Sequence, residues 1–419
     1  MLSSIRRLAL LALAAAAAGG PPSPRPAPTA LAGSARPAAA AQATESRLHL
    51  PMLVHAALRD VPTPAALPTD APATAPTAAP TVAPTASQTP DPTPTSTPPL
   101  PDFEPFGLVR LAPDLLLEGS GSTIDSLAFW EAPDPADSLL LVTAKGNQRV
   151  EVWRQPFLGR ELPALQHPSF GTGTQVNGIV IDQELDRVYI AVSRPASTVA
   201  VFALPGLAFL GELVQGAVDL RSEPNLALLT LPDGVKRLFV SADDRVYAYD
   251  PESGAALGGF APGHSFETLL ADDVDQVLYI PDEVGRSGVY AFNPVGSPYY
   301  RAGEARFGGQ GVFEADAEGI ALYACLTPDG TDDGRGLLIV SDQKADASDF
   351  EFFDRRSWAH LGRLQLDGVR FTDGIASTQQ ALPGHPAGLF AAVDDDTNVA
   401  LIGWERIVAA TGLGCGNVP

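Results

Sequence analysis

The chain has few basic residues, few histidines and very few cysteines. It carries 27 Lys and Arg residues against 49 Asp and Glu residues, which gives a formal net charge of −22. Nothing basic is available to release counterions from a phosphate backbone, so the composition argues against a nucleic-acid partner. The six histidines are scattered along the chain, so zinc ligation is not expected. Only Cys325 and Cys415 are present, and counting alone leaves open whether they form a disulfide.

The chain also lacks the short motifs that are typical of several enzyme classes. It contains no nucleophile elbow, no phosphate-binding P-loop and no metalloprotease helix motif. The loop DGTDDGRG at 329–336 begins like a calcium-binding loop, but Val340 stands where an EF-hand needs a bidentate Glu. We therefore interpret this segment as an ordinary acidic hairpin loop.

Residues 1–20 have the layout of a secretory signal peptide. Basic Arg6 and Arg7 precede an apolar, Ala-rich run, and small residues follow. The run is short for a membrane span, although a retained membrane anchor is the alternative. Residues 21–104 consist mainly of Pro, Ala, Thr and Ser and cannot bury enough apolar surface to fold. We expect a secreted or extracytoplasmic protein with a disordered linker, or stalk, and no membrane span in the mature chain.

A pair of β-rich runs joined by a short polar turn recurs six times after residue 105. The runs are rich in β-branched and aromatic residues, apolar and polar residues alternate, and helical periodicity is absent. A shorter apolar segment with a small residue near its start precedes each pair. The six pairs are SLLLVTAKGNQRVEVW at 138–153, RVYIAVSRPASTVAVFAL at 187–204, RLFVSADDRVYAYD at 237–250, VLYIPDEVGRSGVYAFNP at 277–294, GLLIVSDQKADASDFEFFDRR at 336–356 and GLFAAVDDDTNVALIGWERI at 388–407.

Repeats of this length built from strands predict an all-β fold, a six-bladed β-propeller over residues 105–410 followed by a short tail at 411–419. A β-sandwich is the alternative, since it would also explain many short strands. We expect at least three strands in each blade and a fourth in the connecting stretches. The segment Phe106–Pro113 precedes the first unit and is predicted to supply the outer strand that closes the last blade.

Acidic residues recur at comparable places in several units. Equivalent positions of successive blades converge on one face of a propeller channel, so carboxylates far apart in the sequence can meet there and offer calcium the oxygen ligands it prefers. A solvated acidic rim is the alternative, but Glu318 and Asp373 open apolar strands, where an unpaired buried charge would be costly. The acidic residues are Asp125, Glu267, Asp282, Glu283, Asp316, Glu318, Asp373 and Asp394 to Asp396.

Several segments, taken in order, resemble motifs of the β-propeller phytases. FEADAEGIALY resembles that family's Asp-x-Glu-Gly segment, and GLLIVSDQ resembles its strand ending in Ser-x-Gln. FTDGI, GLFAAVDDDTN and VALIGWERI resemble its Thr-Asp-Gly-Ile, Gly-Leu-Phe and terminal Trp-Glu-Arg-Ile segments. The similarity covers about residues 126–407 and is dense from Glu267 onward, where FETLLADDVDQVLYIPDE is similar to the family's Glu-Gly-Met-x-x-Asp-Asp segment. Single motifs are weak, and their order and spacing carry the resemblance.

The resemblance implies a calcium-dependent phosphomonoester hydrolase of the phytase type, a monomer that acts on myo-inositol hexakisphosphate or a related phosphate ester. Calcium between protein and substrate would let so acidic a chain hold a polyanion. Lys145 in TAKGN and Arg194 in AVSRP would steady the phosphoryl oxygens. The implied calcium ligands are Glu267, Glu283, Asp316, Glu318 and Gln343 around the reaction centre, Asp125 in the first blade, and Asp373, Asp394 and Asn398 in a more structural site.

Two departures from the family pattern keep other functions open. TIDSLAFW retains only Asp125 of the paired aspartates that open the first blade, and Ala242 and Asp243 replace a Lys-Glu pair of the third blade. A cation that helps to bind phosphate is therefore missing. The main alternative is a non-catalytic secreted propeller that uses calcium for stability, and a propeller lactonase or esterase is a third. The alternative for Lys145 and Arg194 is that they are solvated turn residues.

Overall fold

The computed structural model describes residues 105–119, 123–157, 170, 173–214, 220, 223–242, 244–309 and 311–416. The predicted signal peptide (1–20), the predicted stalk (21–104) and the last three residues of the predicted tail lie outside these residues. Strands dominate the described residues, which also contain the short 3-10 helix η1 (Pro135–Asp137) and the α-helix α2 (Trp404–Thr411). They contain no helix that is long and apolar enough to cross a membrane.

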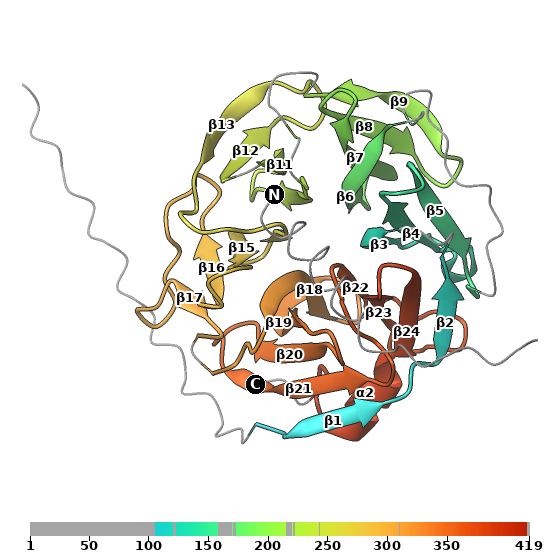
Figure 1. The fold of residues 1–419 in the computed structure, drawn as a ribbon, viewed down its shortest axis with the longest axis vertical. Helices are drawn as coiled ribbons and strands as arrows, with labels where there is room; N and C mark the ends of the chain where they lie inside the picture. The colour runs from blue at the N-terminus through green and yellow to red at the C-terminus, as the bar shows by residue number, and fades with distance from the viewer. Residues whose placement is uncertain are drawn as a thin grey trace, which may run out of the picture. The chain divides into compact units, whose positions relative to one another are not determined.

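Six sheets follow one another around a central axis, which confirms the predicted six-bladed β-propeller (Figure 1). In each blade the strand nearest the axis comes first in the sequence, and each following strand of the repeat pairs antiparallel with the strand before it, moving outward. The first blade consists of β3 (Ile124–Trp130), β4 (Leu139–Ala144) and β5 (Arg149–Arg154). The second consists of β6 (Gln175–Asp182), β7 (Arg187–Arg194), β8 (Thr198–Ala203) and β9 (Ala208–Leu213). The third consists of β10 (Leu226–Thr230), β11 (Lys236–Ala242), β12 (Arg245–Tyr249) and β13 (Ala256–Phe260).

The last three blades follow the same order. The fourth consists of β14 (Leu270–Asp272), β15 (Val277–Pro281), β16 (Val289–Phe292) and β17 (Arg306–Phe307). The fifth consists of β18 (Asp316–Leu326), β19 (Asp332–Gln343), β20 (Asp349–Asp354) and β21 (His360–Leu366), and the sixth of β22 (Ile375–Thr378), β23 (Leu389–Asp394) and β24 (Asn398–Gly403).

Two strands ahead of the first blade complete the last two blades. β2 (Leu115–Glu118) pairs antiparallel with β24 and closes the sixth blade, whereas β1 (Leu108–Leu111) pairs parallel with β21 and adds a fifth strand to the fifth blade. The prediction that Phe106–Pro113 closes the last blade was therefore wrong. The next strand, β2, closes that blade, and Phe106–Pro113 supplies β1 of the fifth blade. Val109 and Leu111 of β1 pack against the apolar cluster shared by blades five and six, which holds this segment one blade earlier than expected.

Several strands, such as β4, β15 and β23, are nearly continuous apolar runs and depart from the expected alternation, because both of their faces are covered by neighbouring blades. In β4, for example, Leu139 and Leu141 pack in a cluster with strands of the second blade, and Leu140 and Val142 pack in a cluster with strands of the sixth. Successive side chains of a strand point to opposite faces, so one strand contributes to two interblade cores. The hydrophobic core is therefore distributed between the blades.

The C-terminal segment is fastened to the fifth blade. The sixth repeat, predicted as strand to residue 407, ends as a strand at Gly403, and α2 follows with Trp404 and Ile407 buried. The Trp404 ring lies 3.9 Å from the ring of Tyr323 in β18, measured between centroids. Cys325 and Cys415 form a disulfide, which answers the question that counting left open.

Small residues at the starts of the inner strands are required by close packing at the axis. A Cβ atom on Gly178 would lie 2.4 Å from the Cα atom of Asn225 in the next blade. On Gly319 it would lie 2.6 Å from the carbonyl oxygen of Asp373, and on Gly374 it would lie 2.2 Å from the carbonyl oxygen of Asp125. Backbone packs directly on backbone here, so the residues just before these glycines are brought close together.

Gly374→Ala should therefore destabilise the propeller, because the new methyl group would overlap the Asp125 carbonyl oxygen. We expect the free energy of unfolding to fall by about 2 kcal/mol or more, measured by denaturant unfolding. The matched control is Gly206→Ala, whose Cβ atom would meet nothing within 4 Å and which should change stability by less than about 0.5 kcal/mol. Equal losses in the two variants would contradict the close packing at the axis.

Candidate metal centre

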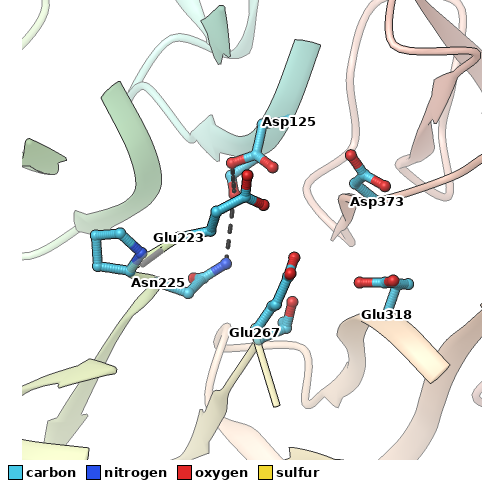
Figure 2. Close-up of a pocket in the computed structure, with 9 residues that line it drawn as sticks. Asp125, Glu223, Asn225, Glu267, Glu318 and Asp373 are labelled. Carbon is cyan, nitrogen blue, oxygen red and sulfur yellow. Dashed lines mark hydrogen bonds between the residues drawn. The ribbon is translucent and has the colours of Figure 1, made fainter. Parts of the chain in front are cut away.

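Carboxylates from five blades surround one small pocket where the inner strands begin. Figure 2 shows the side chains of Asp125, Glu223, Glu267, Glu318 and Asp373 arranged about a common space. Ser126, Asn225 and Thr268 complete its polar lining. The open space is about 10 Å³, close to what a single water-sized sphere needs. Beyond it lies a channel cavity of about 270 Å³ lined by the six inner strands.

The acidic residues occupy the same position in successive repeats, the residue just before the small residue at the axis. Asp125, Glu267, Glu318 and Asp373 hold this position in blades one, four, five and six. Asn177 holds it in the second blade. In the third blade Pro224 stands there and Glu223 precedes it. The repeat therefore places a ring of oxygen-bearing side chains around the axis, which we call the carboxylate ring and define as Asp125, Glu223, Glu267, Glu318 and Asp373.

Local irregularities in the inner strands help to aim these side chains. The register of β3 shifts between Ile124 and Leu127, and that of β18 shifts between Ala317 and Ile320. Asp125 and Glu318 lie within these two shifts. A β-bulge of this kind turns a side chain away from the regular alternation, and here it turns a carboxylate toward the axis.

Lys145 is held by two members of the carboxylate ring. Its Nζ atom lies 2.6 Å from Oδ1 of Asp125 and 2.7 Å from Oε2 of Glu223, and its side chain is only 5 % exposed. The interpretation of Lys145 as a solvated turn residue is therefore wrong. Burial by itself lowers the pKa of Lys145, but Asp125 and Glu223 outweigh it and raise the pKa well above its usual range. Lys145 is charged at any physiological pH.

The carboxylate ring is electrostatically crowded. Burial raises the pKa of Asp125 to about 6, with Lys145 opposing the rise and Glu223 and Asp373 adding to it. Burial also raises the pKa of Glu267 well above its usual range; Glu223 adds to this rise and Lys145 opposes it. A divalent cation would relieve this repulsion and favour the charged carboxylates. The donor set is all oxygen, so it fits calcium.

Three other predicted ligands do not line this pocket, although two of them interact with members of the carboxylate ring. Gln343 donates a side-chain hydrogen bond to Asp373 and so reaches the carboxylate ring. Glu283 is buried, accepts a 3.3 Å hydrogen bond from Ser265 and contributes to the raised pKa of Glu267. Asp316 is 44 % exposed and lies 3.6 Å from Nε of Arg286.

Asp394 and Asn398 lie elsewhere, at the turn between β23 and β24. Asn398 donates a 3.5 Å hydrogen bond to Asp394, which also accepts one from the backbone of Arg370 at 3.3 Å. Neither lines the pocket, whereas Asp373, which the resemblance grouped with them, does. The second calcium site stays a prediction.

Arg194 does not line the pocket either. It is the last residue of β7, its side chain is exposed, and its register partner is Gln175. Its predicted contact with phosphate stays a prediction.

Glu223 is the ring member that the sequence analysis missed. It stands one residue ahead of the repeat position because Pro224 occupies that position, so a comparison in strict register passes over it. The sequence signal was the run EPNLALL, in which Glu immediately precedes an apolar strand. The third blade, in which Ala242 and Asp243 depart from the family pattern, thus still contributes a carboxylate. Asp243 itself lies outside the described residues.

A second acidic group, Asp342, Asp349 and Glu351, also gathers within the fifth blade. Lys344 Nζ lies 2.7 Å from Asp349 and 3.5 Å from Asp342, and Arg363 Nη1 lies 3.2 Å from Asp349. These two cations already occupy the space between the carboxylates. We interpret the group as an ionic network, and the sequence analysis did not predict it.

No family model and no curated protein matches this chain. Among solved structures, one chain from "Crystal Structure of Mitotic Checkpoint Complex" is 12% identical to it, with a TM-score of 0.43. The match covers 74% of this chain and 98% of the other. So distant a likeness carries no argument about function. The strand order and the pocket define the protein as a six-bladed β-propeller with an acidic pocket at one end of its channel.

The raised pKa values make the stability of the metal-free protein depend on pH. Because the pKa of Asp125 rises from 3.8 to about 6 on folding, the folded state binds more protons than the unfolded state between about pH 4 and pH 6. Stability should fall as the pH rises through this window, by about 3 kcal/mol for Asp125. Glu267 acts in the same direction. We expect the melting temperature in chelator to be several degrees lower at about pH 7.5 than at about pH 5.

Asp125→Asn is the matched variant, because it removes the titrating group and keeps its shape. Its melting temperature should change less over the same pH range than that of the wild-type protein. A wild-type melting temperature that rises with pH in the presence of chelator would contradict the electrostatic crowding of the carboxylate ring.

Proposed function

We propose that the protein is a calcium-dependent phosphomonoester hydrolase of the phytase type, with myo-inositol hexakisphosphate or a related phosphate ester as substrate. The observation that carries the proposal is the carboxylate ring, drawn from five blades around an ion-sized space, with Lys145 ion-paired to it. The motifs that resemble the β-propeller phytases support the same activity, because Glu267, Glu318 and Gln343 fall within them.

Calcium suits this pocket better than other common metals. It takes six to eight oxygen ligands in flexible geometry, and the pocket offers carboxylates together with the amide side chain of Asn225. Among the residues that the structure describes, no His or Cys lines the pocket, which disfavours zinc and copper. The carboxylate ring, including Glu223 and Asp373, would hold the ion.

Within this proposal the bound ion would neutralise substrate phosphate and lower the pKa of an attacking water. Lys145 would donate hydrogen bonds to a phosphoryl oxygen, which competes with Asp125 and Glu223 for the same ammonium group. Gln343 would keep Asp373 oriented through their hydrogen bond. Asp125, Glu318 and Asp373 are each less than a tenth exposed, whereas the side chain of Glu223 is 34 % exposed, so the pocket is buried on most of its sides.

A non-catalytic calcium-stabilised binding module is the second candidate. It is favoured by the exposed position of Arg194 outside the pocket and by Ala242 in the third blade, where the family pattern has part of a Lys-Glu pair. In that case the same carboxylate ring would bind calcium for stability alone, and Lys145 would only balance its charge. Activity measurements distinguish the two candidates.

The full-length protein should release phosphate from calcium phytate, and a chelator should abolish the release. Glu318→Gln should lower the rate by roughly 100-fold or more, because it removes a charged ligand of the ion. Glu304→Gln, at an exposed position outside the pocket, is the matched control and should leave the rate unchanged. If no phosphate is released above background while calcium still raises the melting temperature, the enzyme hypothesis is wrong and the binding module is favoured.

Lys145→Met should separate phosphate binding from calcium binding. The variant keeps the length of the side chain and removes its charge, so phosphate release should fall by about 100-fold while calcium binding is retained or tightened. The matched control is Lys236→Met, because Lys236 Nζ is likewise held by two carboxylates, Asp182 at 2.6 Å and Glu184 at 2.9 Å, outside the pocket. Unchanged phosphate release in Lys145→Met would remove Lys145 from the proposed reaction.

A further inference from the structure

A buried hydroxyl group recurs behind the carboxylate ring. Thr143, Ser193, Ser241 and Ser341 stand near the end of the second strand of blades one, two, three and five, and each is at most 2 % exposed. Each faces the start of the inner strand of its own blade, where the ring position lies. The recurrence in four blades indicates a shared structural task.

In the fifth blade the hydroxyl of Ser341 joins two segments that carry ring residues. It accepts a 2.7 Å hydrogen bond from the backbone N–H of Gly319, the residue after Glu318. Its single proton has two acceptors, the carbonyl oxygen of Thr372, the residue before Asp373, at 3.3 Å and that of Gly319 at 3.5 Å, and the shorter of the two contacts crosses to the sixth blade. One buried side chain therefore contacts the neighbours of two pocket carboxylates that come from different blades.

The third blade repeats this arrangement. Ser241 accepts a 2.6 Å hydrogen bond from the backbone N–H of Asn225, and its hydroxyl lies 3.4 Å both from the carbonyl oxygen of Glu267 in the fourth blade and from that of Asn225 in its own blade. In the first blade Thr143 accepts a 3.0 Å hydrogen bond from Ser126 N–H, and the bond stays within the blade. A threonine therefore fits this position as well as a serine.

The two segments joined by Ser341 have no space in which to adjust. A Cβ atom on Gly319 would lie 2.6 Å from the carbonyl oxygen of Asp373, so the backbones already touch. The hydrogen bonds of Ser341 at this contact therefore help to set the position of the segment around Gly319 relative to the segment around Asp373. Since metal affinity depends on how well ligands are held before the ion binds, such a contact controls the relative placement of Glu318 and Asp373.

We propose that Ser341 is a positioning residue of the pocket, which sets the spacing between Glu318 and Asp373 as a pair of calcium ligands. The calcium part of this inference rests on the proposed function. The mechanical part, that the hydroxyl couples the two segments, holds for the protein without metal.

The first test compares calcium affinities by titration calorimetry with calcium chloride and the full-length protein. Ser341→Ala should weaken calcium binding by about tenfold, the effect of losing one buried hydrogen bond. Ser341→Thr should restore the affinity, because it keeps the hydroxyl group that contacts Gly319 and Thr372. Ser138→Ala is the matched control: Ser138 is 2 % exposed and its hydroxyl donates a 2.9 Å hydrogen bond to Gln380 of the sixth blade, outside the pocket. Equal calcium affinities in the Ser341→Ala and Ser138→Ala variants would overturn the proposal.

The second test measures amide hydrogen exchange in chelator. Ser341→Ala should speed exchange about tenfold in both β18 and the segment 372–375, whereas Ser138→Ala should change neither. Unchanged exchange in either segment would overturn the positioning role, even if calcium affinity fell. If the wild-type protein binds no calcium, the proposed function fails, and faster exchange in both segments would still support the coupling through Ser341.

Discussion

The close packing of backbone around the axis is the constraint on which the pocket depends. Gly319 touches the backbone of Asp373, and Gly374 touches the backbone of Asp125, so the inner strands of adjacent blades meet without side chains between them. The side chains of Glu318 and Asp373, the residues just before these glycines, both point into the common space (Figure 2). Carboxylates that are 44 (Glu223 to Glu267) to 248 (Asp125 to Asp373) residues apart in the sequence share one small space for this reason. The same contact explains why the small residue and the acidic residue occur next to each other in the repeats.

The close approach of the ring carboxylates is electrostatically unfavourable, and the stability of the rest of the propeller has to offset it. Buried carboxylates that repel one another raise the pKa of Asp125 and Glu267, and Lys145 offsets only part of this repulsion. A fold that held the ring loosely would relieve the strain by moving the side chains apart. Here buried hydroxyl groups such as that of Ser341 form hydrogen bonds with the backbone beside the ring residues, and apolar clusters fill the space between the blades. The result is a largely buried pocket of oxygen-bearing side chains, the kind of ligand that a hard divalent cation such as calcium takes.

Closure of the ring of blades keeps this geometry. β2 joins the sixth blade to the start of the domain, β1 extends the fifth blade, and the Cys325–Cys415 disulfide fastens the segment after α2 to β18, the strand that carries Glu318. Between the fourth and fifth blades, the fully buried Arg355 makes hydrogen bonds of 2.6 and 2.7 Å to both oxygens of Asp272. These connections lie away from the pocket, and they resist the opening of any one interblade contact that would separate the ring carboxylates.

The six-bladed fold could be predicted from the sequence because its signals are local: alternating apolar and polar residues, short polar turns, and a small residue near the start of the apolar segment that precedes each pair. Asp125, Glu267, Glu318 and Asp373 were identified in the same way, as members of a repeat. Glu223 was missed because Pro224 shifts it out of register, and β1 and β2 were confused because two short apolar segments compete for edges far along the chain. The two carboxylates that hold Lys145, the contact of Gln343 with Asp373, and the exposed position of Arg194 came only from the folded structure. Each of these depends on how blades distant in sequence close into a ring, and a pattern within one repeat carries no information about that closure.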